Sequence, residues 1–179
     1  MSRQYFGDVL TEPIGSAYTT IVATTETVLI PTAFTPINAM EPRAGKVYEL
    51  TVGGTCTTGA SGTLTITPRF GTTVSGVSIG PSLAQTVVPS IATAPFLLRY
   101  WLTIRSTGLT GANSTVVGYG YWQSLGAIAT ASSETDVTFG TVGAAVSVDT
   151  SIAQALWMGV TFSIAPSVIP NIHVWRSLN

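Results

Sequence analysis

Apolar and polar residues alternate with a period of two along most of this chain, and that pattern constrains its fold more than any other feature. Between residues 62 and 70, Leu64 and Ile66 alternate with threonines, and the same alternation recurs at 95–106 and 153–164. Successive side chains of a β-strand point to opposite faces. Each run therefore predicts a strand with one face on an apolar core. The abundant threonine, valine and isoleucine support this, because branched side chains suit a pleated surface.

Turns rich in glycine, proline and asparagine separate these runs and divide the chain into nine predicted strands. The strands are expected near residues 18–24, 26–33, 46–57, 62–70, 95–106, 114–124, 135–148, 153–164 and 168–178. The sequence has no apolar stripe at helical spacing. Short strands without intervening helices are typical of an antiparallel sandwich or barrel. We predict an all-β fold, an antiparallel β-sandwich built as a jelly roll of about eight strands.

The chain divides into a short arm and one domain. Residues 1–16 show no sustained alternation and contain four sizeable apolar side chains, Tyr5, Phe6, Val9 and Leu10. We interpret this segment as an extended N-terminal arm that docks on a partner, with a frayed terminus as the alternative. Residues 17–179 form the predicted jelly-roll domain, because a chain of 179 residues is close to the length of one domain.

Charged residues are scarce, which excludes several classes of partner. They make up 8% of the chain, against about 25% in an ordinary soluble protein. With a formal net charge of -1, the chain lacks the basic surface that binds nucleic acid or an anionic membrane. A spanning helix needs about 20 consecutive apolar residues, far more than any run here. Arg3, Asp8 and Glu12 interrupt the start, so we expect no secretory signal peptide, and no nucleic-acid or membrane partner.

The residues that bind metals are equally few. Cys56 is the only cysteine, so it forms no internal disulfide, and Cys56 with His173 does not complete a tetrahedral zinc site. The acidic residues do not have the spacing of a calcium loop. Asp149 is typical of a turn residue that binds its own backbone. The sequence predicts neither a metal nor a cofactor.

Two patterns suggest catalysis, and both have a simpler explanation. Residues 76–80 match G-x-S-x-G around Ser78, but that motif needs a strand-to-helix turn and a downstream acid followed by a histidine. The single histidine, His173, lies in a predicted strand, where a structural or interface role is more common. Glu134 and Asp136 resemble the carboxylate pair of a glycosidase, but their surroundings indicate a solvated turn. We expect no enzyme.

Three arginines occupy outward positions of their predicted strands. Arg69, Arg99 and Arg105 lie on the faces opposite the apolar stripes. We expect them to pair with the few acids, between strands or between subunits. The alternative is that they stack with Trp101 on bases or sugars.

Three tryptophans also occupy predicted outward positions. Trp101, Trp157 and Trp175 lie opposite the apolar stripes of their strands. Large aromatic residues at such positions favour a subunit interface, whose centre is depleted in charge and enriched in tryptophan and tyrosine. The alternative is that a loop of the same chain packs over them.

Several segments resemble a pattern found in tailed-phage virion proteins with a jelly-roll body. They are Arg43–Gly54 (RAGKVYELTVGG), Gly62–Gly71 (GTLTITPRFG), Pro95-Phe96 at the start of a long strand, Arg105–Gly108 (RSTG), Val148–Ser151 (VDTS) and Ser177–Asn179 (SLN). The resemblance extends from about residue 27 to residue 179 and implies a virion structural role. It transfers no catalytic or binding residue, because these segments contain no defined chemical motif.

From this resemblance we expect a capsid decoration protein, made in the host cytoplasm and located on the capsid surface of the virion. Its expected partners are the major capsid protein of the same particle, contacted by residues 1–16, and further copies of itself in a homotrimer. The main alternative is a tail-fibre or receptor-binding jelly roll that recognises a host glycan, with Trp101 or Trp175 beside an arginine. Two further hypotheses are a coat subunit of a tailless particle and an esterase that uses Ser78.

Overall fold

The computed structural model describes residues 8–11, 20–22, 24–72, 76–87, 89–109, 112–124, 135–140, 144–163 and 167–178. In these ranges the chain forms β-strands, one 3-10 turn at Thr32–Phe34 (η1) and no α-helix. No helix in the described part is long and apolar enough to cross a membrane. The predicted all-β class is confirmed.

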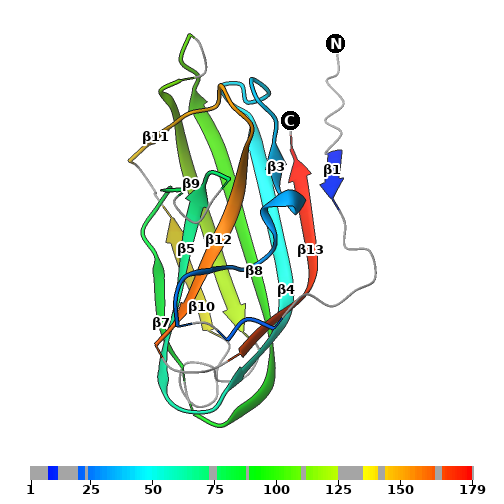
Figure 1. Ribbon diagram of the computed structural model, residues 1–179, viewed down its shortest axis with the longest axis vertical. Helices are drawn as coiled ribbons and strands as arrows, with labels where there is room; N and C mark the ends of the chain where they lie inside the picture. Colours follow the sequence, from blue (N-terminus) through cyan, green and yellow to red (C-terminus); the bar gives the residue numbers. More distant parts are fainter. Residues whose placement is uncertain are drawn as a thin grey trace.

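The strands form two antiparallel sheets that pack face to face (Figure 1). Along sheet A the order is β1 (Asp8–Thr11), β13 (Ser167–Ser177), β4 (Val47–Thr58), β8 (Ile91–Ser106), β9 (Ser114–Ser124) and β10 (Thr135–Gly140), and β11 (Val146–Val148) also pairs with β9. Along sheet B the order is β2 (Thr27–Val28), β12 (Gln154–Phe162) and β5 (Gly62–Phe70), with β3 (Pro36–Ile37) on β12, and with β6 (Val77–Ser78) and β7 (Leu83–Val87) on the far side of β5.

Eight of these strands have the order of a jelly roll. The path β1-β13-β4-β8 of sheet A faces the path β2-β12-β5-β7 of sheet B, which is the arrangement of two interlocked Greek keys. The strands β9, β10 and β11 lie between β8 and β12 in the chain and extend sheet A beyond β8. Because β10 also contacts β7, this extension covers one side of the sandwich. The predicted jelly roll is confirmed, with β9, β10 and β11 added to its frame.

The best-predicted strands have strict alternation and a clear turn on each side. β5 and β9 have the predicted bounds, and β4, β12 and β13 differ from them by one or two residues. On β5 the inward residues Leu64 and Ile66 are fully buried, whereas the threonines between them are half-buried. Burial of one face therefore fixes the register of these strands, because a shift of one residue would turn every apolar side chain outward.

Four predicted strands are wrong in extent, and one of them is 95–106, because β8 begins four residues earlier, at Ile91. In 18–24 the described residues form only an isolated bridge from Ile21 to Val168, and in 26–33 only β2 pairs with β12. The predicted strand 135–148 is divided into β10 and β11, with residues 141–143 outside the described part. The segments 18–24, 26–33 and 135–148 lie at the edges of the sheets or in the strands added beyond β8. The length of a strand there depends on where a neighbouring strand is present to pair with it. The alternation within the segment itself does not encode this.

Stacked aromatic rings fill much of the core between the sheets. The Phe96 and Trp122 rings stack with centroids 4.3 Å apart, and the Tyr48 and Trp175 rings stack at 5.2 Å. All four side chains are buried, and three of them have no exposed surface. Aromatic side chains bury large apolar areas, so these pairs contribute strongly to the packing of sheet A against sheet B.

Trp175 belongs to this core, so the expectation that it faces outward is wrong. It is fully buried, and its indole N–H donates to the carbonyl oxygen of Pro36 at 3.1 Å. A β-bulge between Pro170 and Ile172 explains the difference. The extra residue exchanges inward and outward positions along the rest of β13, so His173 and Trp175 point inward.

Two glycines of β9 make room for a tyrosine of β8. Tyr100 is fully buried on the inner face of sheet A, opposite Gly120, and its ring stacks on Phe139 with centroids 5.6 Å apart. A Cβ atom at Gly118 would overlap the Tyr100 hydroxyl, and one at Gly120 would lie 2.6 Å from the ring. The Tyr100 ring therefore occupies the space that side chains would fill at two positions of the neighbouring strand.

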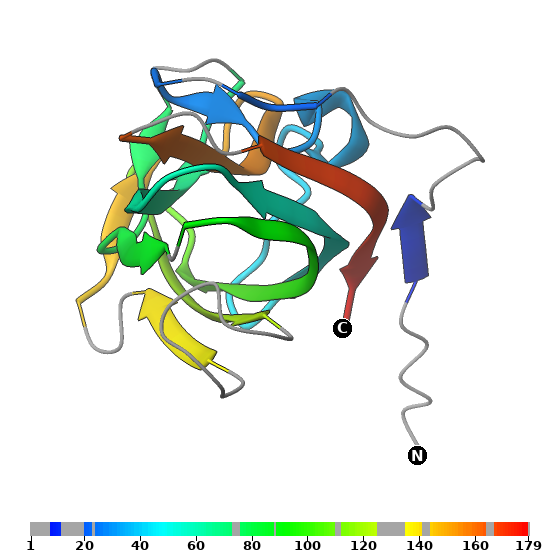
Figure 2. The same cartoon turned by 90° about the horizontal axis from the view of Figure 1, so that it is seen from below.

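Strand β1 lies within the predicted arm and pairs with β13 at the edge of sheet A, with Val9 opposite Arg176. In Figures 1 and 2 it stands beside β13 and apart from the other strands. Leu10 is also part of β1, whereas Tyr5 and Phe6 lie outside the described residues. The contact of this arm with a partner stays a prediction.

Candidate functional site

The outer face of sheet A carries a group of aromatic residues that we call the aromatic face: Arg99 and Trp101 on β8, with Tyr119 and Tyr121 on β9. Trp101 stands opposite Tyr119 and Arg99 opposite Tyr121, so the four side chains form two adjacent cross-strand pairs. They are all partly exposed, Tyr119 most clearly at 42%. The structure therefore confirms the outward position of Trp101 and places two tyrosines beside it.

Ring contacts hold the aromatic face together. The Trp101 ring lies 6.1 Å from the Tyr119 ring and 5.9 Å from the Tyr121 ring, measured between centroids. The Arg99 guanidinium lies 5.4 Å from the centroid of the Trp101 ring, which is cation–π distance. Each side chain is restrained by a neighbour, so the surface is formed before any partner binds.

An acid on the neighbouring strand fixes the arginine. Glu49 on β4 accepts a hydrogen bond from Nη2 of Arg99 at 2.6 Å, and the Glu49 side chain is only 6% exposed, whereas that of Arg99 is 38% exposed. Hydrogen bonding to Tyr121 and the nearby Glu49 carboxylate raise the pKa of Arg99. Nε of Arg99 has no hydrogen-bond partner among the described residues. This arginine is therefore held in place by residues of its own chain.

The apolar surface continues on either side of these four residues. Leu97 lies on the outer face of β8 near Gln123, and Val174 and Ile172 follow on β13, where Ile172 is 51% exposed. Arg105, farther along β8, is exposed. The outer face of sheet A thus combines exposed apolar and aromatic groups with few charges, across four strands of the sheet.

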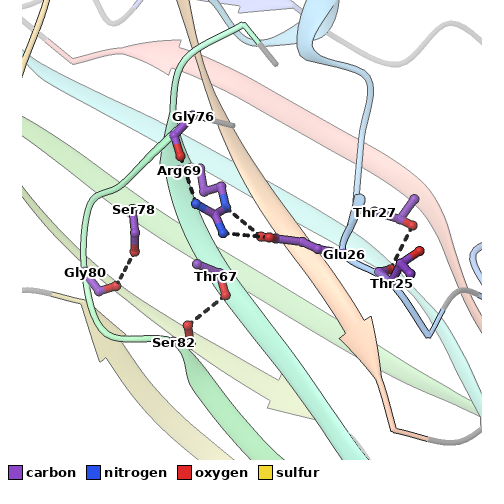
Figure 3. A network of polar contacts seen from close by, with 9 residues as sticks. All are labelled: Thr25, Glu26, Thr27, Thr67, Arg69, Gly76, Ser78, Gly80 and Ser82. Carbon is purple, nitrogen blue, oxygen red and sulfur yellow. Dashed lines mark hydrogen bonds and ion pairs between the residues drawn. The ribbon is translucent and has the colours of Figure 1, made fainter. Parts of the chain in front are cut away.

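The outer face of sheet B is different, because the chain covers its tryptophan. Trp157 on β12 has no exposed surface, so the expectation that it contributes to an interface is wrong and the loop alternative is correct. The segment before β2 brings Glu26 to Arg69 on β5, which donates from Nε and Nη2 to the two carboxylate oxygens at 2.7 and 2.6 Å (Figure 3). The Arg69 guanidinium lies 5.7 Å from the centroid of the Trp157 ring.

The ion pair has further support from the chain around it. Arg69 also donates from Nη1 to the carbonyl oxygen of Gly76 at 2.8 Å, and its hydrogen bond to Glu26 raises its pKa. The expected pairing of arginines with acids is therefore confirmed for Arg69 and Arg99. Glu26 and Arg69 together form a polar cover over Trp157, which leaves sheet A as the sheet with open aromatic surface.

Gly159 on β12 provides the space for this cover, since a Cβ atom there would overlap the Glu26 carboxylate. We expect Gly159→Ala to displace Glu26 from Arg69 and to lower the free energy of unfolding by about 1.5 kcal/mol, at the lower end of the range for a hydrogen bond to a charged group. The loss stays moderate because the end of a flexible side chain can move away.

Urea unfolding of Gly159→Ala in the wild-type and Glu26→Ala backgrounds measures this coupling. The glycine substitution should cost less where the carboxylate is already absent. Equal losses in the two backgrounds would show that Gly159 does not act through Glu26.

Ser78 and His173 are not brought together. Ser78 lies on β6 at the edge of sheet B, where its hydroxyl donates to the carbonyl oxygen of Gly80 at 3.0 Å, and β6 is followed by a turn and β7 instead of a helix. His173 is buried on β13 of sheet A, with its ring 5.2 Å from that of Phe34. Burial lowers the pKa of His173 and favours its neutral form. These positions support the structural interpretation of both residues.

The remaining candidates also have structural positions or lie outside the described part. Asp149 accepts hydrogen bonds from the backbone N–H and the hydroxyl of Ser151 at 2.8 and 2.6 Å, as expected for a turn residue. Cys56 is buried, which raises the pKa of its thiol to about 11. Glu134 is outside the described residues, and Asp136 lies on β10. Within the described ranges, no group of three His, Cys, Asp or Glu residues is placed to hold a metal ion.

Arg99 and Trp101 were expected from the sequence, whereas Tyr119, Tyr121 and Glu49 were missed. The alternation of β9 places both tyrosines on its outward face, which was the available signal. Their proximity to Trp101 depends on the register between β8 and β9, which requires the strand pairing. Comparisons with protein-family models, curated proteins and solved structures found no match to this chain.

Proposed function

We propose that this chain is a structural protein of a phage particle, a capsid decoration protein that binds the assembled coat through the aromatic face. The observation that carries the proposal is the open outer face of sheet A, where Trp101, Tyr119 and Tyr121 remain accessible while Trp157 and Trp175 are buried. The jelly-roll frame and the resemblance of its segments to tailed-phage virion proteins support the same assignment.

The composition of the aromatic face suits binding to another protein. Interface centres are enriched in tryptophan, tyrosine and arginine, and the residues that dominate binding energy are drawn from these types. The one charged pair, Arg99 with Glu49, is already formed within the chain. A partner therefore covers this surface without leaving an unpaired buried charge.

Binding to the assembled coat explains how such a protein acts without chemistry. A ligand that binds the assembled state and not the dissociated one stabilises the assembled state by mass action. Copies bound around a symmetry axis, as a homotrimer on the capsid surface, reinforce one another through the shared lattice. The function is mechanical, and its partner is the major capsid protein of the same particle.

Loading of variants onto coat shells tests the docking role. We expect Trp101→Ala combined with Tyr119→Ala to reduce the apparent affinity for shells by about 30-fold or more, because a central aromatic residue of an interface contributes about 2 kcal/mol or more. The bound copies are quantified after sedimentation of the shells. Thr65→Ala on the outer face of sheet B is the matched control and should load normally. Normal loading of the aromatic variant, with its fold intact, contradicts docking through this face.

A second function, glycan recognition by a tail-fibre or receptor-binding domain, is supported by the position of Arg99 over Trp101. An aromatic ring beside a charged hydrogen-bond donor is suited to stacking on a sugar ring while binding its hydroxyls. Trp175, the other tryptophan considered for this role, is buried. The number of copies in purified particles separates the two functions, since hundreds indicate decoration and a few to a few dozen indicate a tail position.

A further inference from the structure

Strand β13 is paired along its whole length on one side and only in part on the other. On one side it pairs with β4 from Ser167 to Ser177. On the other side the described residues place only β1, opposite the end of β13 from Trp175 to Ser177, and a single bridge at Val168. The N–H and C=O groups of a sheet edge form a template for pairing with a further strand.

Strand β1 is attached to the molecule through this edge. Within the described part of the chain, β13 is the element with which β1 makes extended contact, and both views show β1 beside it and apart from the packed layers (Figures 1 and 2). Its attachment within the described part of the chain therefore rests on strand pairing with β13. The β13 strand of a second copy offers the same backbone donors and acceptors, because the two edges are identical.

The chain between β1 and the body is long enough for this. Residues 12–20 connect Thr11 to Ile21 and span about 30 Å when extended. The distance along β13 between Trp175, which pairs with β1, and Val168, which pairs with Ile21, is about 23 Å. The connecting residues are therefore longer than the distance they span within one copy, so their length does not restrict β1 to the β13 of its own chain.

We propose that β1 is exchanged between copies of this chain, so that β1 of one copy pairs with β13 of the next in the register that sets Val9 opposite Arg176. A ring of such exchanges joins three copies and leaves each β1 paired with a β13 strand. The exchange concerns the contact between copies, and it is independent of what the aromatic face binds.

Disulfide trapping tests the exchange, because residues opposite each other on paired strands have Cβ atoms about 4.5–5.5 Å apart. Val9→Cys and Arg176→Cys are made in separate chains, one with a tag that changes its mass, and the two chains are co-expressed and oxidised mildly. The expected product on a non-reducing gel is a heterodimer of distinct mass, which forms only when β1 and β13 come from different copies. Cys56 is buried with a raised thiol pKa, so the wild-type chain provides the background.

A register control and the double variant complete the test. Ile172→Cys, on the same strand but beyond the β1 pairing, should give much less heterodimer with Val9→Cys. A single chain carrying both Val9→Cys and Arg176→Cys should give covalent oligomers. The exchange is contradicted if the co-expressed pair gives no heterodimer and the double-cysteine chain gives no covalent oligomer. An internally linked monomer and an unlinked chain both count as the absence of an oligomer. This experiment does not measure loading onto shells. A negative result in disulfide trapping therefore leaves the proposal of docking through the aromatic face unaffected.

Discussion

Replacing Trp122 by alanine should lower the free energy of unfolding by about 3–5 kcal/mol, the range for removing a large buried aromatic side chain. Trp122 has no exposed surface and stacks on Phe96 with ring centroids 4.3 Å apart. The deletion removes this contact and leaves a cavity between the sheets. A domain is typically stable by about 5–15 kcal/mol, so the variant should retain the fold with a much lower denaturation midpoint.

Trp101→Ala is the matched control for this substitution, because Trp101 lies on the opposite face of the same sheet. It should cost about 1 kcal/mol, since Trp101 is partly exposed and its contacts are a cation–π pair with Arg99 and ring contacts with two partly exposed tyrosines. Guanidinium unfolding followed by circular dichroism measures both losses. Similar losses in the two variants would contradict the assignment of Trp122 to the inner face and Trp101 to the outer face.

Replacing Gly118 by alanine should destabilise the protein by about 3 kcal/mol, at the upper end of the usual cost of overpacking. The added methyl group would occupy the position of the Tyr100 hydroxyl, and Tyr100 is a rigid, fully buried ring packed on Phe139. Unlike the Glu26 side chain over Gly159, this ring has no solvent into which it can move. The substitution therefore displaces β8 from β9 or forces Tyr100 out of the core.

Two further variants test whether the loss comes from the overlap with Tyr100 or from replacing a glycine as such. Gly45→Ala has no atom within 4 Å of the new Cβ and a φ of +85°, so it carries only the strain of a left-handed backbone, about 1–2 kcal/mol. Adding Tyr100→Phe to Gly118→Ala removes the nearest overlapping atom and should restore part of the loss. Thermal midpoints of the three variants compare these effects. A Gly118→Ala variant as stable as wild type would show that the Tyr100 ring does not depend on this glycine.

The frame of the fold was predictable because burial of one face leaves a pattern in the sequence of each central strand. β5 and β9 alternate strictly between turns and have the predicted bounds. The short edge strand β7, Leu83–Val87, was missed, because a strand paired on one side has a weak pattern of its own. The bulge in β13 was also missed, since a single extra residue leaves both flanking runs looking regular.

The candidate site was predictable only in part, because its residues meet through pairing between strands. The outward positions of Arg99 and Trp101 follow from the alternation of β8. The neighbouring tyrosines and the partner acid Glu49 depend on the registers of β8 with β9 and with β4, which no single strand encodes. Trp157 has the same outward pattern as Trp101, but it is buried beneath Arg69, which is held by Glu26, more than a hundred residues away from Trp157 in the chain.

The residues of the aromatic face come from two groups of strands, and this has a consequence for how the surface can change. Arg99 and Trp101 belong to a strand of the eight-strand frame, whereas Tyr119 and Tyr121 belong to the strands inserted between β8 and β12. Half of the proposed docking surface can thus change through substitutions in these inserted strands while the eight-strand frame stays the same. A lineage of such molecules would retain one architecture and diversify its targets by changing a single contiguous stretch of the gene.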